Sequence, residues 1–424
     1  MALKIFKFGG ASVKDADSVR NVASVLNKFS GQQIITVVSA MGKITNLLEM
    51  LVDAYFYQKG DTQMVLEQIK KYHFDILKNL FPIASHPVYN DVNTVFLALE
   101  NYVKGSPSHS YNKDYDQIVS QGEIISSKIV SAYLMEAGIK NSWLDIRSII
   151  KTDDTYREGK VNWDLTQKLV TERVPLSEGV GGGITLTQGF LGQTPDGFTT
   201  TLGREGSDYT AAILAHCTNA ESVTIWKDVH GVMNADPKWF DETKLIDQMS
   251  YQDAIELSYY GATVIHPKTI KPLQNKKIPL YVRSFVQPDE KGTLINDQQS
   301  QLPIPCFIFK VNQILLSISP KDFSFIVEEN FSDIFKIFSE HHVKINVMQN
   351  SAISFSVCTD NDERKIPELI KTLQKKFRVL YNDNMELITI RYYNQTTIER
   401  VCIGKKVFLE HKSRYTVQLV VKNR

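Results

Sequence analysis

The stretch LKIFKFGGASVKDADSVRNVASVLNKFSGQQIITVV, residues 3–38, contains the pattern that decides the fold. Leu3–Phe8 is a short apolar run typical of a strand, and a glycine pair, Gly9-Gly10, follows it. From Asp15 to Phe29 apolar residues recur at helical spacing, and Ile34–Val38 is a β-branched run short enough for a buried parallel strand. Strand, loop, helix and strand in this order predict an α/β sandwich.

The same alternation continues to about residue 282. Apolar stripes predict helices in a mostly helical region from Asp61 to Leu134 and at Ile44–Tyr55, Ser207–His216, Tyr251–Tyr260 and Pro267–Leu273. Further strands are predicted at Trp143–Ile146, Ile184–Phe190, Val223–Trp226 and Pro279–Val282. The polar, proline-containing stretch Gln287–Pro305 predicts a linker or domain edge. We therefore expect a catalytic domain over residues 1–295.

Short β/α/β units follow the expected linker and predict a small α+β region over residues 305–424. Its pattern contains a partial internal repeat, and the second repeat is short, because little sequence follows the strand predicted at Tyr415–Val421. We expect Cys306–Val311 to supply a strand to this second repeat.

The amino-acid composition limits the kinds of molecule that this protein is expected to bind. The 424 residues carry a net charge of +1, which gives no bulk attraction to nucleic acid or to an anionic membrane surface. The four cysteines are far apart and form no metal-binding or disulfide pattern, so no metal site is predicted and a reducing compartment is favoured. The N-terminus reaches Lys7 too soon for the apolar core of a signal peptide, and no apolar run could span a membrane. We expect a cytoplasmic protein.

Two loops have residues suited to anion binding. Lys7–Val13 places an ammonium, a glycine pair and a helix start at one strand end, an arrangement that suits a polyphosphate, although an ordinary tight turn explains it about as well. Thr199–Thr210 is a polar loop that enters a helix with Ser207 and Asp208 in its first turn. Arg204 beside that helix start is suited to a carboxylate, which a simple helix cap does not explain.

Several motifs along the chain together resemble the aspartate kinases of the amino-acid-kinase superfamily. In order they are KFGGASV, VVSAMGKITNLL, SQGE, TQGF, TTTLGREGSDYTAA, WKDVHGVMNADP and YGATVIHPKT. The resemblance implies a three-layer αβα sandwich followed by a pair of ACT-type regulatory units. It implies the transfer of a phosphoryl group from ATP, with Mg²⁺, to L-aspartate, in the first step towards lysine, threonine and methionine.

The same resemblance implies a role for individual residues. Lys7 would neutralise the transferring phosphoryl group, and Asp208 would hold Lys7 in place. The site that binds the phosphates would be lined by Gly9, Gly10 and Ser39. Aspartate would be bound by Thr45, Glu123, Phe190, Arg204 and Ser207, with Arg204 on its α-carboxylate and Glu123 on its α-ammonium. The nucleotide would contact Lys227, Asp228, Met233 and Lys238. His266 is interpreted as a residue that starts a helix rather than as a catalytic residue.

The sequence departs from the family pattern at several positions. Glu205 stands where relatives often have glycine, Thr263 where they have lysine, Met233 where they have tyrosine, and Lys227-Asp228 where they have Thr-Asp. A cation lost at Thr263 and one gained at Lys227 suggest the hypothesis that the anionic end of the nucleotide is held from a different side.

The regulatory region implies an amino-acid effector and a homodimer. The resemblance places effector contacts at Lys344, Ile345, Asn346, Asn350 and Ser351. Asn346 offers no ion pair to an effector ammonium, so lysine, threonine or no effector all stay open. The chain leaves no room for a fused homoserine dehydrogenase, and none is expected. Two other functions stay open: a kinase for glutamate or N-acetylglutamate, and a catalytically silent amino-acid sensor.

Overall fold

The computed structural model describes residues 2–174, 183–240, 242–262, 265–298, 304–322 and 324–424. The chain divides into two compact units. The N-terminal unit comprises Met1–Val232, Leu245–Ile255 and Ile265–Ser300; the C-terminal unit comprises Met233–Lys244, Glu256–Val264 and Gln301–Arg424. Nothing in the sequence indicates that the two short segments before residue 265 belong to the C-terminal unit.

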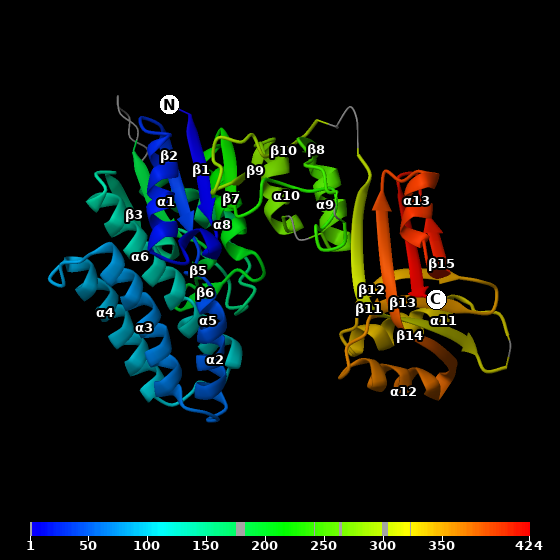
Figure 1. The fold of residues 1–424 in the computed structure, drawn as a ribbon. Coiled ribbons are helices and arrows are strands. Elements are labelled where there is room, and N and C mark those ends of the chain that lie inside the picture. The colour runs from blue at the N-terminus through cyan, green and yellow to red at the C-terminus, as the bar shows by residue number, and fades with distance from the viewer. Residues whose placement is uncertain (1, 175–182, 241, 263–264, 299–303, 323) are drawn as a thin grey trace. The chain divides into compact units, whose positions relative to one another are not determined.

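The N-terminal unit is built on a sheet whose centre is parallel (Figure 1). Among the described residues eight strands are joined in the order β3-β4-β2-β1-β7-β9-β10-β8. Their bounds are β1 Leu3–Phe8, β2 Gln33–Val38, β3 Asn141–Leu144, β4 Ile184–Gln188, β7 Ser222–Lys227, β8 Gln248–Ser250, β9 Leu280–Ser284 and β10 Thr293–Asn296. All six residues of β2 are buried, the polar Gln33 and Thr36 included, which explains why four of them are apolar and do not alternate strictly with polar residues.

Helices cover both faces of this sheet. Phe6 and Phe8 of β1 belong to one core cluster with α1 (Ala16–Asn27) and α6 (Gln121–Glu136), whereas α8 (Gly206–Thr218) packs against β1, β2 and β7. The first layer is extended by α2 Ile44–Phe56, α3 Thr62–Leu80, α4 Pro87–Lys104 and α5 Tyr111–Val119. In the second layer α8 is flanked by α7 Trp163–Arg173 and α10 Pro267–Lys276. The predicted three-layer αβα sandwich is therefore confirmed.

The structure also corrects details of the prediction. Thr293–Asn296 forms β10, antiparallel to β9, inside the stretch predicted as a linker, because the alternating buried Thr293 and Ile295 find a partner strand only in the tertiary fold. The strand predicted to reach Ile146 ends at Leu144, and a short 3₁₀ helix, Ile146–Ser148, follows. A small hairpin, β5 Leu191–Gln193 and β6 Thr199–Thr201, was too short to predict.

The C-terminal unit holds an antiparallel sheet with helices against it (Figure 1). Among its described residues the strand order is β12-β13-β11-β14-β16-β15. The strands are β11 Cys306–Pro320, β12 Ile345–Asn350, β13 Phe355–Asp360, β14 Phe377–Arg391, β15 Lys405–Lys412 and β16 Thr416–Asn423. The helices are α11 Glu328–Glu340, α12 Ile366–Lys376 and α13 Gln395–Cys402, and α9 Tyr251–Tyr260 begins in the N-terminal unit and ends in this one.

Two long strands serve both repeats of this ACT-type region. The later part of β11 pairs with β13, whereas Cys306–Lys310 pairs with Leu387–Arg391 of β14, which in turn pairs with β16. Two separate hydrophobic clusters lie along these strands, one with α11 and α12 and one with α13. The prediction that Cys306–Val311 gives a strand to the short second repeat is confirmed.

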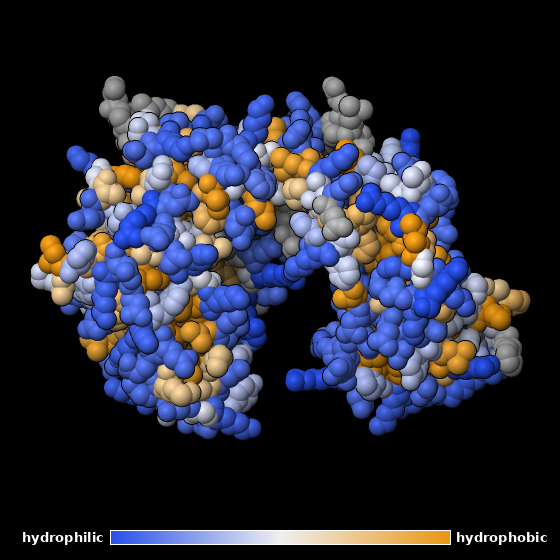
Figure 2. All heavy atoms as spheres, viewed as in Figure 1, coloured by the Kyte–Doolittle hydropathy of each residue, from blue (hydrophilic) through white to orange (hydrophobic). Residues whose placement is uncertain are grey.

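Hydrophilic residues cover most of the face that Figure 2 shows on each unit, with small scattered groups of hydrophobic residues. Within the described part of the chain no helix is long and apolar enough to cross a membrane. Cys217, Cys358 and Cys402 are free thiols, and Cys217, Cys306 and Cys358 are buried.

Candidate active site

A pocket of about 920 Å³ lies in the N-terminal unit where the central parallel strands end. Lys7 is near the end of β1, Ser39 follows β2, Phe190 follows β4, and Lys227 ends β7. In the strand order β2 and β7 lie on opposite sides of β1, so the chain order reverses there. Ligands of open α/β sheets bind at the carboxyl ends of strands at such a reversal, because the connections leave a crevice. The remaining described lining residues are Thr45, Asn112, Tyr115, Glu123, Thr155, Tyr156, Arg157, Glu158, Thr201, Gly203, Arg204, Glu205, Gly206, Ser207 and Asp208.

Lys7 and Asp208 form a buried ion pair at the base of this pocket. The Lys7 Nζ atom lies 2.6 Å from Asp208 Oδ1, and the two residues are 9% and 3% exposed. Asp208 sits in the first turn of α8, where the helix dipole favours a negative charge. Because a buried charge is costly without its partner, each side chain fixes the position of the other. The ammonium is thus held ready for an anionic ligand.

The Gly9-Gly10 turn lies against the loop after β2. Gly42 N donates a hydrogen bond to Gly10 O at 3.0 Å, and Ser39 N donates to Phe8 O at 3.1 Å. A Cβ atom on Gly10 would lie 2.7 Å from Gly42 O and 3.0 Å from Ala40 O, both of them backbone atoms. Only glycine therefore lets these two loops approach each other.

We expect Gly10→Ala to lower turnover at least about 100-fold, because the added methyl group must push the two loops apart and misplace the groups they carry. Gly9→Ala is the matched control, since a Cβ there meets only Lys7 Nζ at an ordinary 3.4 Å. It should lose less than about tenfold. Equal losses in steady-state assays of both variants would contradict the steric argument.

A cationic side chain and a buried carboxyl group line the same pocket. Arg204, in the turn before α8, is exposed and makes no ion pair or hydrogen bond with any residue that the structure describes. Glu123, on the first turn of α6, is only 3% exposed; its Oε1 atom accepts a bond from Ala40 N at 3.3 Å, and its buried Oε2 atom has no partner among the described residues. Burial raises the pKa of Glu123 to about 8. The pocket therefore offers a cation for a carboxylate and a buried acid for a cationic group.

Close backbone contacts bring Phe190 and Ser207 together on one wall. A Cβ on Gly189 would lie 2.4 Å from the Ser207 side chain, and one on Gly206 would lie 2.5 Å from the Phe190 ring. Phe190 itself has a φ of 73°, in the left-handed region, and its N–H donates to Thr210 Oγ1 at 2.9 Å. The two glycines thus allow the turn after β4 to pack directly on the start of α8.

Comparison with models of protein families matches residues 2–284 to the amino acid kinase family. The chain belongs to this family.

Relatives within the amino acid kinase family were found by sequence and by structure. The chain is 29% identical over 417 residues to the lysine-sensitive aspartokinase 3 of Escherichia coli, which covers 95% of this chain and 90% of that protein. It is also 29% identical to a chloroplastic bifunctional aspartokinase/homoserine dehydrogenase 2 of Arabidopsis thaliana, of which it spans only 42%. The structure of E. coli aspartokinase III in complex with aspartate and ADP superimposes with a TM-score of 0.81 at 25% identity, covering 99% of this chain and 96% of that one.

A loop that the sequence did not single out completes this amino acid kinase pocket. Thr155 to Glu158 line it, and Arg157 has a φ of 68° with its guanidinium 4.3 Å from the Tyr115 ring centre. The buried carboxylate of Asp116, on α5, holds this loop through Arg157 N at 2.9 Å. It also accepts bonds from Thr201 N at 2.9 Å and from Thr201 Oγ1 at 2.7 Å. Only the polar turn composition around Thr155 could have indicated a loop here.

Burial raises the pKa of Asp116 to about 6, from an ordinary value of 3.8. The native state therefore binds the proton more tightly than the unfolded chain does, and this residue's contribution to stability falls as pH rises from about 4 through 6. Asp116→Asn should remove that part of the pH dependence and keep the loop, because the amide oxygen can accept from both N–H groups and the amide NH2 can donate to Thr201 Oγ1. Asp116→Ala leaves them unpaired and should cost about 3 kcal/mol. Denaturant unfolding at several pH values tests both, and an unchanged pH slope in the Asn variant would argue against this assignment.

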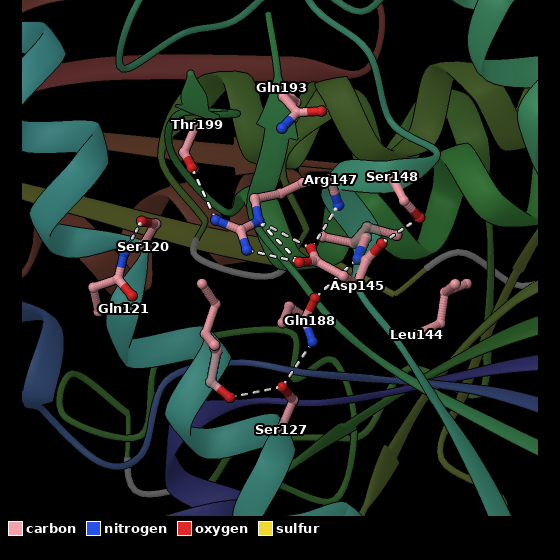
Figure 3. Close-up of polar contacts among 12 residues, drawn as sticks. Ser120, Gln121, Ser127, Leu144, Asp145, Arg147, Ser148, Gln188, Gln193 and Thr199 are labelled. Atoms are coloured by element: carbon pink, nitrogen blue, oxygen red, sulfur yellow. Dashed lines mark hydrogen bonds and ion pairs between the residues drawn. The ribbon is translucent and has the colours of Figure 1, made fainter. Parts of the chain in front are cut away.

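Buried and half-buried polar contacts fix the ends of strands near the pocket, and Figure 3 shows them. The Gln188 amide, at the end of β4, donates to Ser127 Oγ at 2.8 Å and accepts from Ile146 N at 2.9 Å. The Arg147 guanidinium pairs with Asp145 at 2.6 Å and donates to Thr199 Oγ1 at 3.1 Å. These bonds join α6, β4, the 3₁₀ helix and β6, and so set where Phe190 and the start of α8 lie.

The residues predicted to bind the nucleotide are divided between the two units. Lys227 lines the pocket, whereas the exposed Asp228 is not among the lining residues. Met233 and Lys238 belong to the C-terminal unit, where Lys238 N donates to Asp236 Oδ1 at 2.9 Å. The assignment of these four residues to the nucleotide stays a prediction.

Positions that depart from the family pattern have different explanations. Glu205 has a φ of 53°, where glycine is free of strain, and its Oε2 atom accepts a bond from His266 N at 2.8 Å. His266 caps α10 through Nδ1, which accepts from Lys268 N at 3.2 Å, so its interpretation as a helix-start residue is confirmed. Thr263 lies outside the described residues, and the exchange hypothesis with Lys227 stays untested.

Three of the five predicted effector residues lie together in the C-terminal unit. Lys344, Ile345 and Asn346 line a small closed gap that has no room for a water molecule. Asn346 is held by Lys310 Nζ at 3.0 Å, Gln313 Oε1 at 2.8 Å and Asp360 Oδ1 at 3.0 Å. The other two predicted residues, Asn350 and Ser351, are at the end of β12 and in the turn after it, and they do not line this gap.

Proposed function

We propose that this chain is an aspartate kinase, which transfers the γ-phosphoryl group of ATP to the side-chain carboxylate of L-aspartate and yields 4-phospho-L-aspartate and ADP. The observation that carries the proposal is one pocket in which a buried Lys7–Asp208 pair faces the buried Glu123 and Arg204, which has no partner among the described residues. A dicarboxylic amino acid has the matching groups: an α-carboxylate for Arg204, an α-ammonium for Glu123 and a second carboxylate to react. The E. coli relative whose structure holds aspartate and ADP supports this choice.

In the reaction an oxygen of the aspartate side-chain carboxylate attacks the γ-phosphorus. The bond from that phosphorus to the oxygen bridging the β- and γ-phosphates breaks, and ADP leaves with the electron pair. The attacking carboxylate is already ionised at neutral pH, so no general base is needed and Asp208 has a positioning role. Because two anions must meet, the Lys7 ammonium and the N–H groups of the Gly9-Gly10 turn would offset their repulsion.

Mg²⁺ would enter this site bound to ATP and would neutralise phosphate charge there. Among the described residues no group of three or more histidine, cysteine, aspartate or glutamate side chains could hold a metal ion. The phosphate oxygens and water would therefore supply most of its ligands, as is usual for this ion in kinases.

The further parts of the proposal concern organisation and control. We infer a catalytic domain over residues 1–295 and a regulatory region over 305–424 that forms a homodimer and senses an amino acid, lysine or threonine, near Asn346. A cytoplasmic location is favoured by the free thiols of Cys217, Cys358 and Cys402. The lysine-sensitive E. coli relative supports a feedback role for lysine.

One assay distinguishes aspartate kinase from the other candidates. The protein is incubated with ATP, Mg²⁺ and, in turn, L-aspartate, L-glutamate and N-acetyl-L-glutamate, and hydroxylamine traps any acyl phosphate as a hydroxamate. We expect hydroxamate from aspartate alone. Product from glutamate or its N-acetyl derivative would assign another member of the family, and no product from any acid would favour a silent sensor.

A further inference from the structure

A second cavity, of about 490 Å³, lies between α7, α8 and α10 of the N-terminal unit. None of its described lining residues lines the active-site pocket. Its volume is in the range of small-molecule sites. The lining residues are Trp163, Tyr209, His216, Lys268, Lys271, Pro272 and Asn275.

Aromatic rings form one part of this α7–α8–α10 cavity. The Trp163 ring centre lies 6.5 Å from that of the buried Tyr209 and 5.1 Å from that of His216, and both contacts are edge-on. Neither the Trp163 indole N–H nor the Tyr209 hydroxyl has a hydrogen-bond partner among the described residues. The cavity therefore offers flat apolar faces together with polar groups that a ligand could satisfy.

The charge of the lining is positive. Lys268 and Lys271 are its charged members, and no acidic residue is among the described lining. Lys271 is exposed and has no ion pair or hydrogen bond with the described residues. His216 Nδ1 lies 3.1 Å from Pro272 O, so this nitrogen carries the proton and, in the neutral ring, Nε2 is left as an acceptor. A ligand that fits would carry a negative charge for the lysines and a donor for the imidazole.

We propose that this cavity binds a small aromatic carboxylate bearing an amino or hydroxyl group. Its ring would contact Trp163 and Tyr209, its carboxylate would pair with Lys268 and Lys271, and its amino or hydroxyl hydrogen would be donated to His216 Nε2.

The cavity is also joined to the turn that carries Arg204. Lys268 Nζ stands 4.9 Å from the Tyr209 ring centre and donates to Leu202 O at 2.9 Å. On the other side of Arg204, the Glu205 carboxylate is bonded to His266 N, just before α10. A bound carboxylate would compete with Leu202 O for the Lys268 ammonium and so loosen one end of this turn. If the proposed function holds, on which this step rests, occupancy raises the KM for aspartate.

Binding is tested on the full chain with 2-aminobenzoate, whose own fluorescence anisotropy reports the bound fraction. We expect saturable binding that weakens about tenfold or more in Lys271→Met and in Lys268→Met. Lys276→Met is the matched control, because Lys276 lies on the same helix but bonds to Asn219 outside the cavity lining, and it should bind normally. Aniline and cyclohexanecarboxylate should each compete at least about tenfold less well than an aromatic carboxylate, because aniline lacks the carboxylate and cyclohexanecarboxylate lacks the aromatic ring.

No saturable binding, or equal affinity in all three lysine variants, would overturn the site. Equal competition by inorganic phosphate or by cyclohexanecarboxylate would overturn the aromatic class. Because anisotropy needs no turnover, a protein that binds 2-aminobenzoate but makes no hydroxamate would contradict the proposed function and leave the site standing. An unchanged KM for aspartate at saturating 2-aminobenzoate would reject the coupling to Arg204.

Discussion

Replacing Lys7 with alanine is expected to lower turnover about 1000-fold, while aspartate still binds. The ammonium would act where negative charge develops, on the transferring phosphoryl group, and its removal would leave that charge to the backbone N–H groups and the Mg²⁺ that enters with ATP. The aspartate contacts proposed for Arg204 and Glu123 come from other elements, α6 and the turn before α8, so aspartate should still bind. Its affinity near neutral pH should fall only in so far as the Lys7 charge, which lowers the pKa of Glu123, is lost. Steady-state kinetics and calorimetric titration with aspartate measure the two effects separately.

A difficulty with this variant is that it leaves Asp208 buried without its partner, which could cost several kcal/mol of stability. The double variant Lys7→Met with Asp208→Asn removes both charges and should fold while staying as inactive as the single variant. Lys4→Ala, in the same strand but outside the active-site pocket, is the matched control and should keep its activity. Near-normal turnover in the double variant would refute the role given to Lys7.

The affinity for aspartate is expected to rise steeply with pH because of Glu123. Burial holds its pKa at about 8, so the empty site contains mostly the neutral acid at neutral pH. An α-ammonium is bound best by the carboxylate, and binding must therefore release a proton. By linkage the KM for aspartate should fall about tenfold per pH unit from about pH 6 and level off above about pH 8.

Glu123→Gln tests this expectation, because the amide keeps the size of the side chain and cannot ionise. Its KM for aspartate should be high and nearly independent of pH over the same range. Glu136→Gln, an exposed glutamate at the end of the same helix, should show the normal pH profile. A flat profile in the unaltered protein, or a steep one in Glu123→Gln, would mean that another group controls the affinity.

Periodicity predicted most of the regular elements of the fold because their patterns are strong over short distances. The fully buried β2 and the amphipathic α1 were expected within one or two residues of their observed bounds. Short strands such as β5, β6 and β10 were missed, because three or four residues have too little pattern of their own and become strands only by pairing.

The sequence by itself determined the architecture and the reacting groups: a strand-end lysine before a glycine pair, and an arginine, serine and acid at a helix start. These features could be predicted from the sequence because each is a pattern of residues that lie within a few positions of one another. The family resemblance implied which groups share the pocket, and only the tertiary structure decided that Asp116 holds its wall and that burial raises the pKa of Glu123. The reason is physical: burial and pairing depend on contacts between residues far apart in the chain, such as Asp116 with Arg157 and Thr201, and a local sequence pattern carries no information about such contacts.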